Sequence, residues 1–254
     1  FGVQAGYSNT TGLKLVALGR QAGYKNTTGN SNTYVGDSAG YSNDVSPHNT
    51  AVGDSALYLN SGGYNSALGS SALNSNTTGG SNVAVGYQSL QNNTTASYNT
   101  AVGYQSLYSN TTGASNTAVG YGAASVNATG VSLVAMGRDA LGANTTGSYN
   151  VAIGQSALIS NTTAPNNTAV GYQAGYSNTT GAGNSFFGTS AGYYQANTGS
   201  PYNTAFGVQA LYGAAGASGY QNVAFGAFAL QASTSGAYNV AVGNLALAST
   251  TSAL

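Results

Sequence analysis

Asn150-Val151-Ala152-Ile153-Gly154-Gln155-Ser156-Ala157-Leu158 is the stretch that decides the fold, because near-copies of it recur throughout the 254 residues. Its central glycine returns at Gly2, Gly19, Gly36, Gly53, Gly69, Gly86, Gly103, Gly120, Gly137, Gly154, Gly171, Gly188, Gly207, Gly226 and Gly243. Eleven of the fourteen intervals are 17 residues, one is 16 and two are 19. Fixed spacing indicates a repeat protein in which each coil buries apolar side chains against its neighbours. We expect a single array over residues 1–254.

The residues before each glycine alternate in size with a period of two. The residue two before is nearly always Ala, with Tyr34 and Phe186 as departures, and Thr, Val or Ser often stands three before. This alternation predicts a short strand. The bulky residue directly before the glycine is predicted to be core: Leu18, Val35, Val52, Leu68, Val85, Val102, Val119, Met136, Ile153, Val170, Phe187, Phe206, Phe225 and Val242.

The residues after each glycine predict the rest of a coil. A small residue three after and Leu, Ala or Gly four after suggest a second strand, and the glycine between the strands permits a bend. Asn-Thr-Thr-Gly, as at residues 110–113, then supplies turn conformations. The expected fold is an all-β parallel β-solenoid, or β-roll, of about fifteen 17-residue coils with two short strands per coil.

Two asparagine columns accompany the strands. Asn stands four before the glycine in 12 of 14 copies, with Leu15 and Leu133 as exceptions, and seven after it in 11 of 15. Stacked amides can form a hydrogen-bonded ladder from coil to coil. Turn propensity alone is the alternative explanation.

The composition excludes several functional classes. Four Lys or Arg and four Asp leave no net charge, so no basic face is available for nucleic acid. No apolar run is long enough to cross a bilayer, so we expect no membrane insertion. The absence of cysteine excludes disulfides and thiolate metal sites.

No catalytic, cofactor or metal site is predicted. His48 is the only histidine and has no acidic partner nearby in sequence, so it is expected to be a solvated turn residue. Asp37 and Asp54 share a column with Arg20, which predicts a surface ion pair. No Gly-rich turn has the Lys and helix of a phosphate loop. We therefore expect a protein that is not an enzyme.

Two surface columns are candidate contact sites. Asn-x-Thr patterns make possible glycan acceptors of Asn9, Asn26, Asn76, Asn93, Asn110, Asn127, Asn144, Asn161 and Asn178, although Asn-Thr-Thr-Gly is also good turn chemistry. Tyrosines five after the glycine could stack on sugar rings or pack against a neighbouring chain. They are Tyr7, Tyr24, Tyr41, Tyr58, Tyr108, Tyr176, Tyr193 and Tyr212.

The repeats Asn82-Val83-Ala84-Val85-Gly86 and Asn116-Thr117-Ala118-Val119-Gly120 resemble the head repeats of trimeric autotransporter adhesins and related phage tail-fibre-like repeat proteins. The resemblance extends over essentially the whole chain. It implies a left-handed parallel β-roll, a homotrimer, and display at the cell surface or on a virion. The repeat here is longer than the usual head repeat of that family.

These observations lead to three functional hypotheses. The first is a non-enzymatic extracellular fibre segment, adhesive or receptor-contacting, whose partners are copies of itself and a host-surface glycan or protein receptor. The second is a purely structural, self-assembling and glycosylated extracellular filament, with end-to-end contacts between subunits. The third is an ice-binding solenoid, based on the Thr columns. Neither the sequence end nor its beginning shows a capping coil, so we expect a segment of a longer fibre or an end-to-end stacking subunit.

Overall fold

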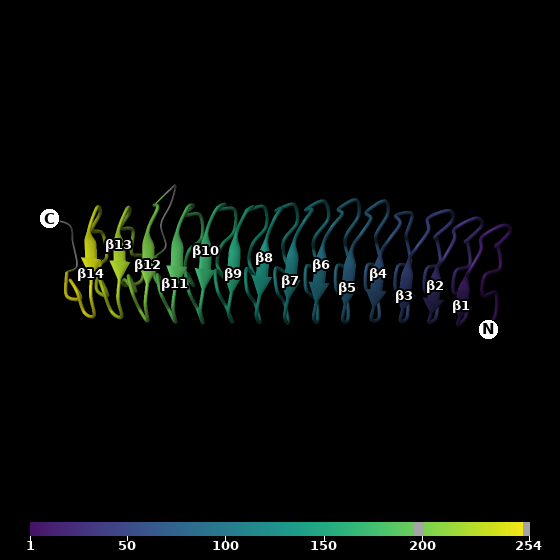
Figure 1. Cartoon of the computed structure of the whole chain (residues 1–254), viewed down its shortest axis with the longest axis horizontal. Coiled ribbons are helices and arrows are strands. Elements are labelled where there is room, and N and C mark those ends of the chain that lie inside the picture. The colour runs from purple at the N-terminus through teal and green to yellow at the C-terminus, as the bar shows by residue number, and fades with distance from the viewer. Residues whose placement is uncertain (196–200, 251–254) are drawn as a thin grey trace. The chain divides into compact units, whose positions relative to one another are not determined.

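A computed structural model describes residues 1–195 and 201–250. The chain divides into two compact units, Phe1–Thr129 and Gly130–Leu254. Each unit is a parallel β-solenoid, in which a short strand recurs once per coil (Figure 1). None of the described residues is helical. The predicted all-β solenoid is therefore confirmed, and the prediction that both units form a single array stays a prediction.

The strands of both units are three residues long and end directly before a repeat glycine. The first unit contains β1 (Val16–Leu18), β2 (Thr33–Val35), β3 (Thr50–Val52), β4 (Ser66–Leu68), β5 (Val83–Val85), β6 (Thr100–Val102) and β7 (Thr117–Val119). The second contains β8 (Val134–Met136), β9 (Val151–Ile153), β10 (Thr168–Val170), β11 (Ser185–Phe187), β12 (Thr204–Phe206), β13 (Val223–Phe225) and β14 (Val240–Val242). The copy at Gly2 has only Phe1 before it and forms no strand.

Equivalent residues of successive coils pair in parallel register. In the first unit Val83 pairs with Thr100 and Ala84 with Ala101, and in the second Val151 pairs with Thr168. The one-coil register places every column of the repeat in a straight row. Left-handed winding stays a prediction that depends on the family resemblance.

The alternation along the strands is confirmed, but the predicted core column is wrong. Its members are partly or well exposed: Leu18 is 48% exposed, Leu68 52%, Phe225 52% and Val242 68%. The alanine column points inward instead, with Ala84 and Ala101 fully buried. Successive residues of a strand point to opposite faces of the sheet. If the bulky residue is assumed to point inward when the alanine does, every side chain is therefore assigned to the wrong face. The column from Leu18 to Val242 therefore lies on the outside of the sheet.

The predicted second strand is replaced by a tight series of turns. In the coil after Gly86, Gln88 and Leu90 have left-handed backbone conformations, with φ of 55° and 51°. These two residues alternate with ordinary ones, so Ser89 and Leu90 both face inward and are fully buried. In a pleated strand adjacent side chains would point to opposite faces. The segment still bonds to both neighbouring coils, because the Gln88 N–H donates to the Ser70 carbonyl and the Leu90 N–H to the Ser106 carbonyl, each at 3.0 Å.

The interior contains alanine, leucine and asparagine. In most coils the second strand residue is a buried alanine and a buried leucine stands four residues after the glycine; in the first unit these leucines are Leu57, Leu73, Leu90 and Leu107. Both asparagine columns are also buried, except at Asn9 and Asn239. Their amides can be buried because most of them bond to a group in a neighbouring coil, although the Nδ2 of Asn99 has no partner.

The asparagine ladders are confirmed by their hydrogen bonds. In one column the Asn93 Nδ2 donates to Asn76 Oδ1 at 2.7 Å and to the Ala96 carbonyl at 3.0 Å. In the other, the Asn99 backbone N–H donates to Asn82 Oδ1 at 3.0 Å. Buried amides paired in this way satisfy the polar groups of the turns and hold successive coils in register.

Two aromatic residues of the alanine column are accommodated by glycines. Tyr34 is fully buried, and a Cβ added to Gly23 or Gly40 would lie 2.8 Å or 2.3 Å from its ring carbons. Gly23 and Gly40 stand four residues after their repeat glycines, a position that holds Leu in most other coils. The second unit repeats the arrangement: Phe186 is buried, and a Cβ on Gly192 would lie 2.5 Å from its ring. A large ring in one column is thus balanced by glycines on both neighbouring turns.

The repeat glycine is required by its backbone and by its neighbour. Gly86 has a φ of 127°, and a Cβ there would lie 2.5 Å from the carbonyl oxygen of Gly103 in the next coil. Any side chain would disturb the contact between coils. The close contact between coils therefore restricts this position to glycine more strictly than the bend expected from the sequence.

Candidate functional site

The structure places the candidate glycan acceptors inside the solenoid. Asn26, Asn76, Asn93, Asn110, Asn127, Asn144, Asn161 and Asn178 are all fully buried, and only Asn9 is exposed. Their side-chain amides belong to the ladder described above; for example, Asn110 Nδ2 donates to Asn93 Oδ1 at 3.0 Å. A glycan on such a nitrogen would replace an N–H donor and require space that the core lacks. A stripe of glycans on the folded chain is therefore contradicted for every candidate except Asn9.

The candidate contact tyrosines form stacks of parallel rings. In the first unit Tyr7, Tyr24, Tyr41 and Tyr58 form one stack. The ring centroids of successive members are 5.0 to 5.3 Å apart, and their planes are within 9° of each other. Tyr24 and Tyr41 each have a ring on both sides. Stacking on a sugar needs an open ring face, so these two residues present only ring edges and hydroxyls outward.

The second unit has a similar stack. Tyr176 and Tyr193 are 4.7 Å apart, and Tyr193 and Tyr212 are 5.2 Å apart. Burial raises the pKa of Tyr193 and of Tyr212 above the usual value, with a smaller contribution from neighbouring tyrosines. Tyr108 has no stacking partner among the described residues. A contact role for this column stays a prediction, limited to hydroxyls, ring edges and the end faces of each stack.

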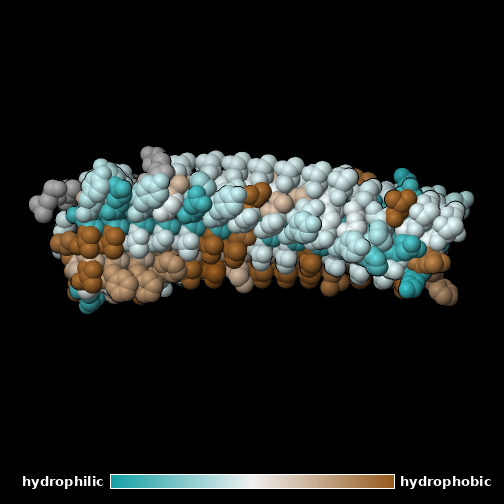
Figure 2. Space-filling view, turned by 45° about the horizontal axis from the view of Figure 1, so that its top comes forward, coloured by the Kyte–Doolittle hydropathy of each residue, from teal (hydrophilic) through white to brown (hydrophobic). Residues whose placement is uncertain are grey.

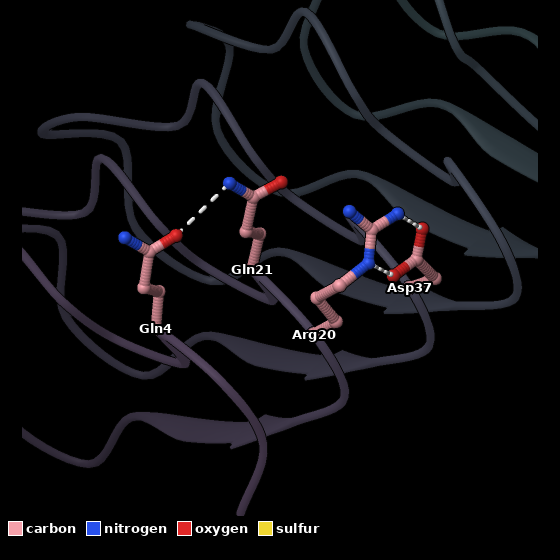
Figure 3. Close-up of polar contacts among 4 residues, drawn as sticks. All are labelled: Gln4, Arg20, Gln21 and Asp37. Carbon is pink, nitrogen blue, oxygen red and sulfur yellow. Dashed lines mark hydrogen bonds and ion pairs between the residues drawn. The ribbon is translucent and has the colours of Figure 1, made fainter.

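The predicted surface ion pair is confirmed. Arg20 Nε lies 2.7 Å from Asp37 Oδ1 and its Nη2 lies 2.7 Å from Oδ2, which gives a two-point contact between successive coils (Figure 3). In the adjacent column, Gln21 Nε2 donates to Gln4 Oε1 at 3.1 Å. The hydrogen bond to Asp37 and then its charge raise the pKa of Arg20. Both partners are solvent-exposed, so the pair adds little to stability.

His48 is stacked rather than simply solvated. Its ring lies 5.0 Å from that of Tyr64 in the next coil, with planes 18° apart. Both residues lie five before their repeat glycine and have left-handed backbones, with φ of 57° and 63°.

An apolar surface along the strands was missed from the sequence. We call it the outer strand face: the side chains at the first and third positions of every strand. In the first unit it includes Val16, Leu18, Leu68 and Val83, which are 38 to 52% exposed. In the second unit Phe187, Phe206 and Phe225 stack along it, with centroids 5.7 and 5.0 Å apart. Figure 2 shows hydrophobic side chains gathered along the lower border of the view in each unit, below a largely polar surface.

Other kinds of site are not formed by the described residues. They contain no group of three His, Cys, Asp or Glu side chains that could hold a metal ion, and no pocket. No helix that could cross a membrane is found in residues 1–195 and 201–250. Comparisons with protein-family models, curated proteins and solved structures give no match to this chain.

Proposed function

We propose that the chain is a non-enzymatic segment of an extracellular fibre, displayed at a cell surface or on a virion, and that copies of it associate through the outer strand faces. The turns then remain exposed for contact with a host-surface glycan or protein receptor. The observation that carries the proposal is the outward orientation of the bulky column.

An apolar strand face of this kind requires a cover. A soluble monomer rarely exposes a long contiguous row of Val, Leu and Phe, and such rows mark interaction surfaces. Here every coil contributes one bulky side chain to the row, and the parallel register keeps the row straight within each unit.

A second copy of the chain is the partner that fits this face best. The row repeats once per coil, so another copy presents the same spacing and can place its side chains between those of the first. The face carries no charge in the first unit, since its strands contain only Val, Ala, Leu, Thr, Ser and Tyr. Three copies, as in the family that the repeats resemble, would enclose the three faces around one axis.

Sedimentation analysis of strand-face variants tests the association. The wild-type chain of 25.0 kDa should sediment as a trimer. Val85→Lys with Val102→Lys places two charges in the outer strand face, which should release monomers because burying unpaired charges is costly. Thr95→Lys with Thr112→Lys is the matched control, since it adds the same charges to exposed turns of the same coils. A wild-type chain that stays monomeric at high concentration would refute the proposal.

The adhesive role needs a separate measurement. The assembled wild-type protein should bind cells or a glycan array through its turns, and the Thr95→Lys, Thr112→Lys variant should bind differently while remaining a trimer. An assembled fibre that retains no ligand would favour the purely structural filament. Left-handed winding and glycan decoration play no part in either experiment.

Ice binding is a second candidate for the same face. Thr33, Thr50, Thr100 and Thr117 point outward at the first strand position, beside the apolar third position, and form rows with the strand spacing of about 4.8 Å. An ice-binding protein would keep this face open to solvent. A monomeric chain that shows thermal hysteresis would support this alternative, and the absence of hysteresis would end it.

A further inference from the structure

We propose that Tyr64 and Tyr98 form a binding site for a neutral, phenol-type aromatic ring, which inserts between them above Ser81. The site lies on a turn of the first unit, away from the strands, and does not depend on the association proposed above.

The three residues occupy equivalent positions in successive coils. Each lies five before its repeat glycine, and their φ values are 63°, 58° and 62°. Their backbone N–H groups donate to the carbonyls of Pro47, Gly63 and Gly80 respectively, in each case at 3.1 Å. The same backbone conformation and the same hydrogen bond give the three Cα–Cβ bonds a common direction and a spacing of one coil.

Aromatic rings in neighbouring coils of this column stack on each other. His48 and Tyr64 are adjacent members, and their ring centroids are 5.0 Å apart. The His48 ring therefore covers the face of Tyr64 that points toward the preceding coil. Ser81 follows Tyr64 and interrupts the stack, so that the next ring belongs to Tyr98, two coils from Tyr64.

The interruption has the dimension of one ring. Two coils separate equivalent ring positions by about 10 Å. Stacked aromatic rings prefer centroid distances of about 4.5–7 Å. A ligand ring halfway between Tyr64 and Tyr98 would lie about 5 Å from each. It would thus take the place that an aromatic residue would occupy at position 81.

Exposure and chemistry favour a small neutral ligand. Tyr64 is 63% exposed and Tyr98 is 71% exposed, and no aromatic ring among the described residues stacks on Tyr98. Residues 55–137 contain no Asp, Glu, Lys or Arg, so the surrounding sequence offers a ligand no charged partner. The Ser81 hydroxyl makes no hydrogen bond within the described protein and can bond to a phenol hydroxyl. A tyrosine side chain on a partner peptide would provide this chemistry.

Titration with N-acetyltyrosinamide, followed by saturation-transfer NMR, tests the site. The wild-type chain should bind the uncharged phenol. Tyr98→Ser removes one wall and should weaken binding about three- to tenfold. Ser81→Tyr fills the gap with a ring that the column already accommodates at its neighbours, and should abolish binding without loss of fold.

Ser115→Tyr is the matched control. It introduces the same ring into the same column, on the far side of Tyr98, and leaves the gap open, so binding should remain within about twofold of wild type. Equal binding by the Ser81→Tyr variant and wild type would overturn the proposal. So would failure of the wild-type chain to bind the phenol, or binding of an uncharged methyl glucoside in preference to it.

Discussion

The balance between Tyr34 and its flanking glycines gives a sharp test of the packing. The perturbation is a set of substitutions that convert this region to the arrangement of the other coils. Tyr34→Ala restores the common alanine, and Gly23→Leu with Gly40→Leu restores the leucines that stand at equivalent positions such as Leu57. The three changes together should be far better tolerated than Tyr34→Ala or Gly40→Leu alone.

The magnitudes follow from the burial and the distances. Tyr34 is fully buried between two glycines, so Tyr34→Ala leaves a cavity that neither neighbour can fill and should cost about 3–5 kcal/mol. In the wild-type background, the Cβ of a leucine at position 40 would lie 2.3 Å from the Tyr34 ring, and the overpacking should cost about 3 kcal/mol.

The two leucines should compensate for the lost ring. Each buries a side chain, which contributes about 1.5–3 kcal/mol. A left-handed backbone opposes this by about 1 kcal/mol per leucine, a cost that Leu57 already accepts at a φ of 53°. The pair should therefore return about 1–4 kcal/mol of the loss caused by Tyr34→Ala.

Urea denaturation followed by far-UV circular dichroism measures these differences. The predicted order of midpoints is wild type first, then the triple variant, with Tyr34→Ala and Gly40→Leu lowest. If the triple variant unfolds at the same urea concentration as Tyr34→Ala, leucines at positions 23 and 40 do not fill the space that the Tyr34 ring occupies. The reasoning about the interior would then be wrong.

Three further predictions concern the glycines, the asparagines and the buried phenol. Gly86→Ala should destabilise the chain by about 3 kcal/mol or more, whereas Gly243→Ala, with a similar φ of 122° but nothing within 4 Å of the added Cβ, should cost only about 1–3 kcal/mol in thermal unfolding. Expression through a secretory pathway that glycosylates unfolded chains should attach glycans to Asn93 and its equivalents and prevent folding. The chain folded in bacteria should have the mass of its sequence, and a folded, fully glycosylated product would contradict this prediction. Burial raises the pKa of Tyr34, and the neighbouring Asn49 side chain lowers this pKa by a smaller amount. The unfolded chain therefore ionises this residue from about pH 10, while the folded chain keeps the proton. In urea titrations at each pH, the difference in stability between wild type and Tyr34→Phe should be constant below that pH, and wild type should lose about 1.4 kcal/mol per pH unit relative to the variant above it. The Phe variant should also be about 1 kcal/mol more stable at neutral pH, because the Tyr34 hydroxyl makes no hydrogen bond.

The periodicity of the sequence predicts the solenoid, but it does not determine which strand face is buried. Ala152 and Ile153 alternate correctly, and a period of two is the same whichever residue points inward. The larger residue is the natural choice for a core, and this choice fails because the interior already contains Leu158 and two amide columns. The alternating left-handed residues of the turns bring these groups close together, so alanine fits opposite them and a larger residue requires glycine in the neighbouring turns.

The outcome of each site prediction also depends on the chemistry of its side chains. Asn-Thr-Thr-Gly is good turn chemistry and also a glycan acceptor pattern, and both interpretations place Asn93 at the surface. Its 17-residue recurrence in register with a second asparagine column was the available signal for a buried ladder. The glycines beside Tyr34 and Phe186 were a similar signal, since large residues in one column coincide with glycine in another. The stacking of the tyrosines, in contrast, required the coil spacing from the structure.

Spin labelling tests the outward strand face and its cover together. The chain contains no cysteine, so a single label can be placed at Val102→Cys on the outer strand face or at Thr112→Cys on an exposed turn. In the assembled protein, labels at position 102 of different copies should lie within about 20 Å and broaden one another's spectra, because the faces meet around one axis. Labels at position 112 should be farther apart and mobile. A mobile, unbroadened label at position 102 at all concentrations would show that the face is open to solvent, which would contradict the proposed association.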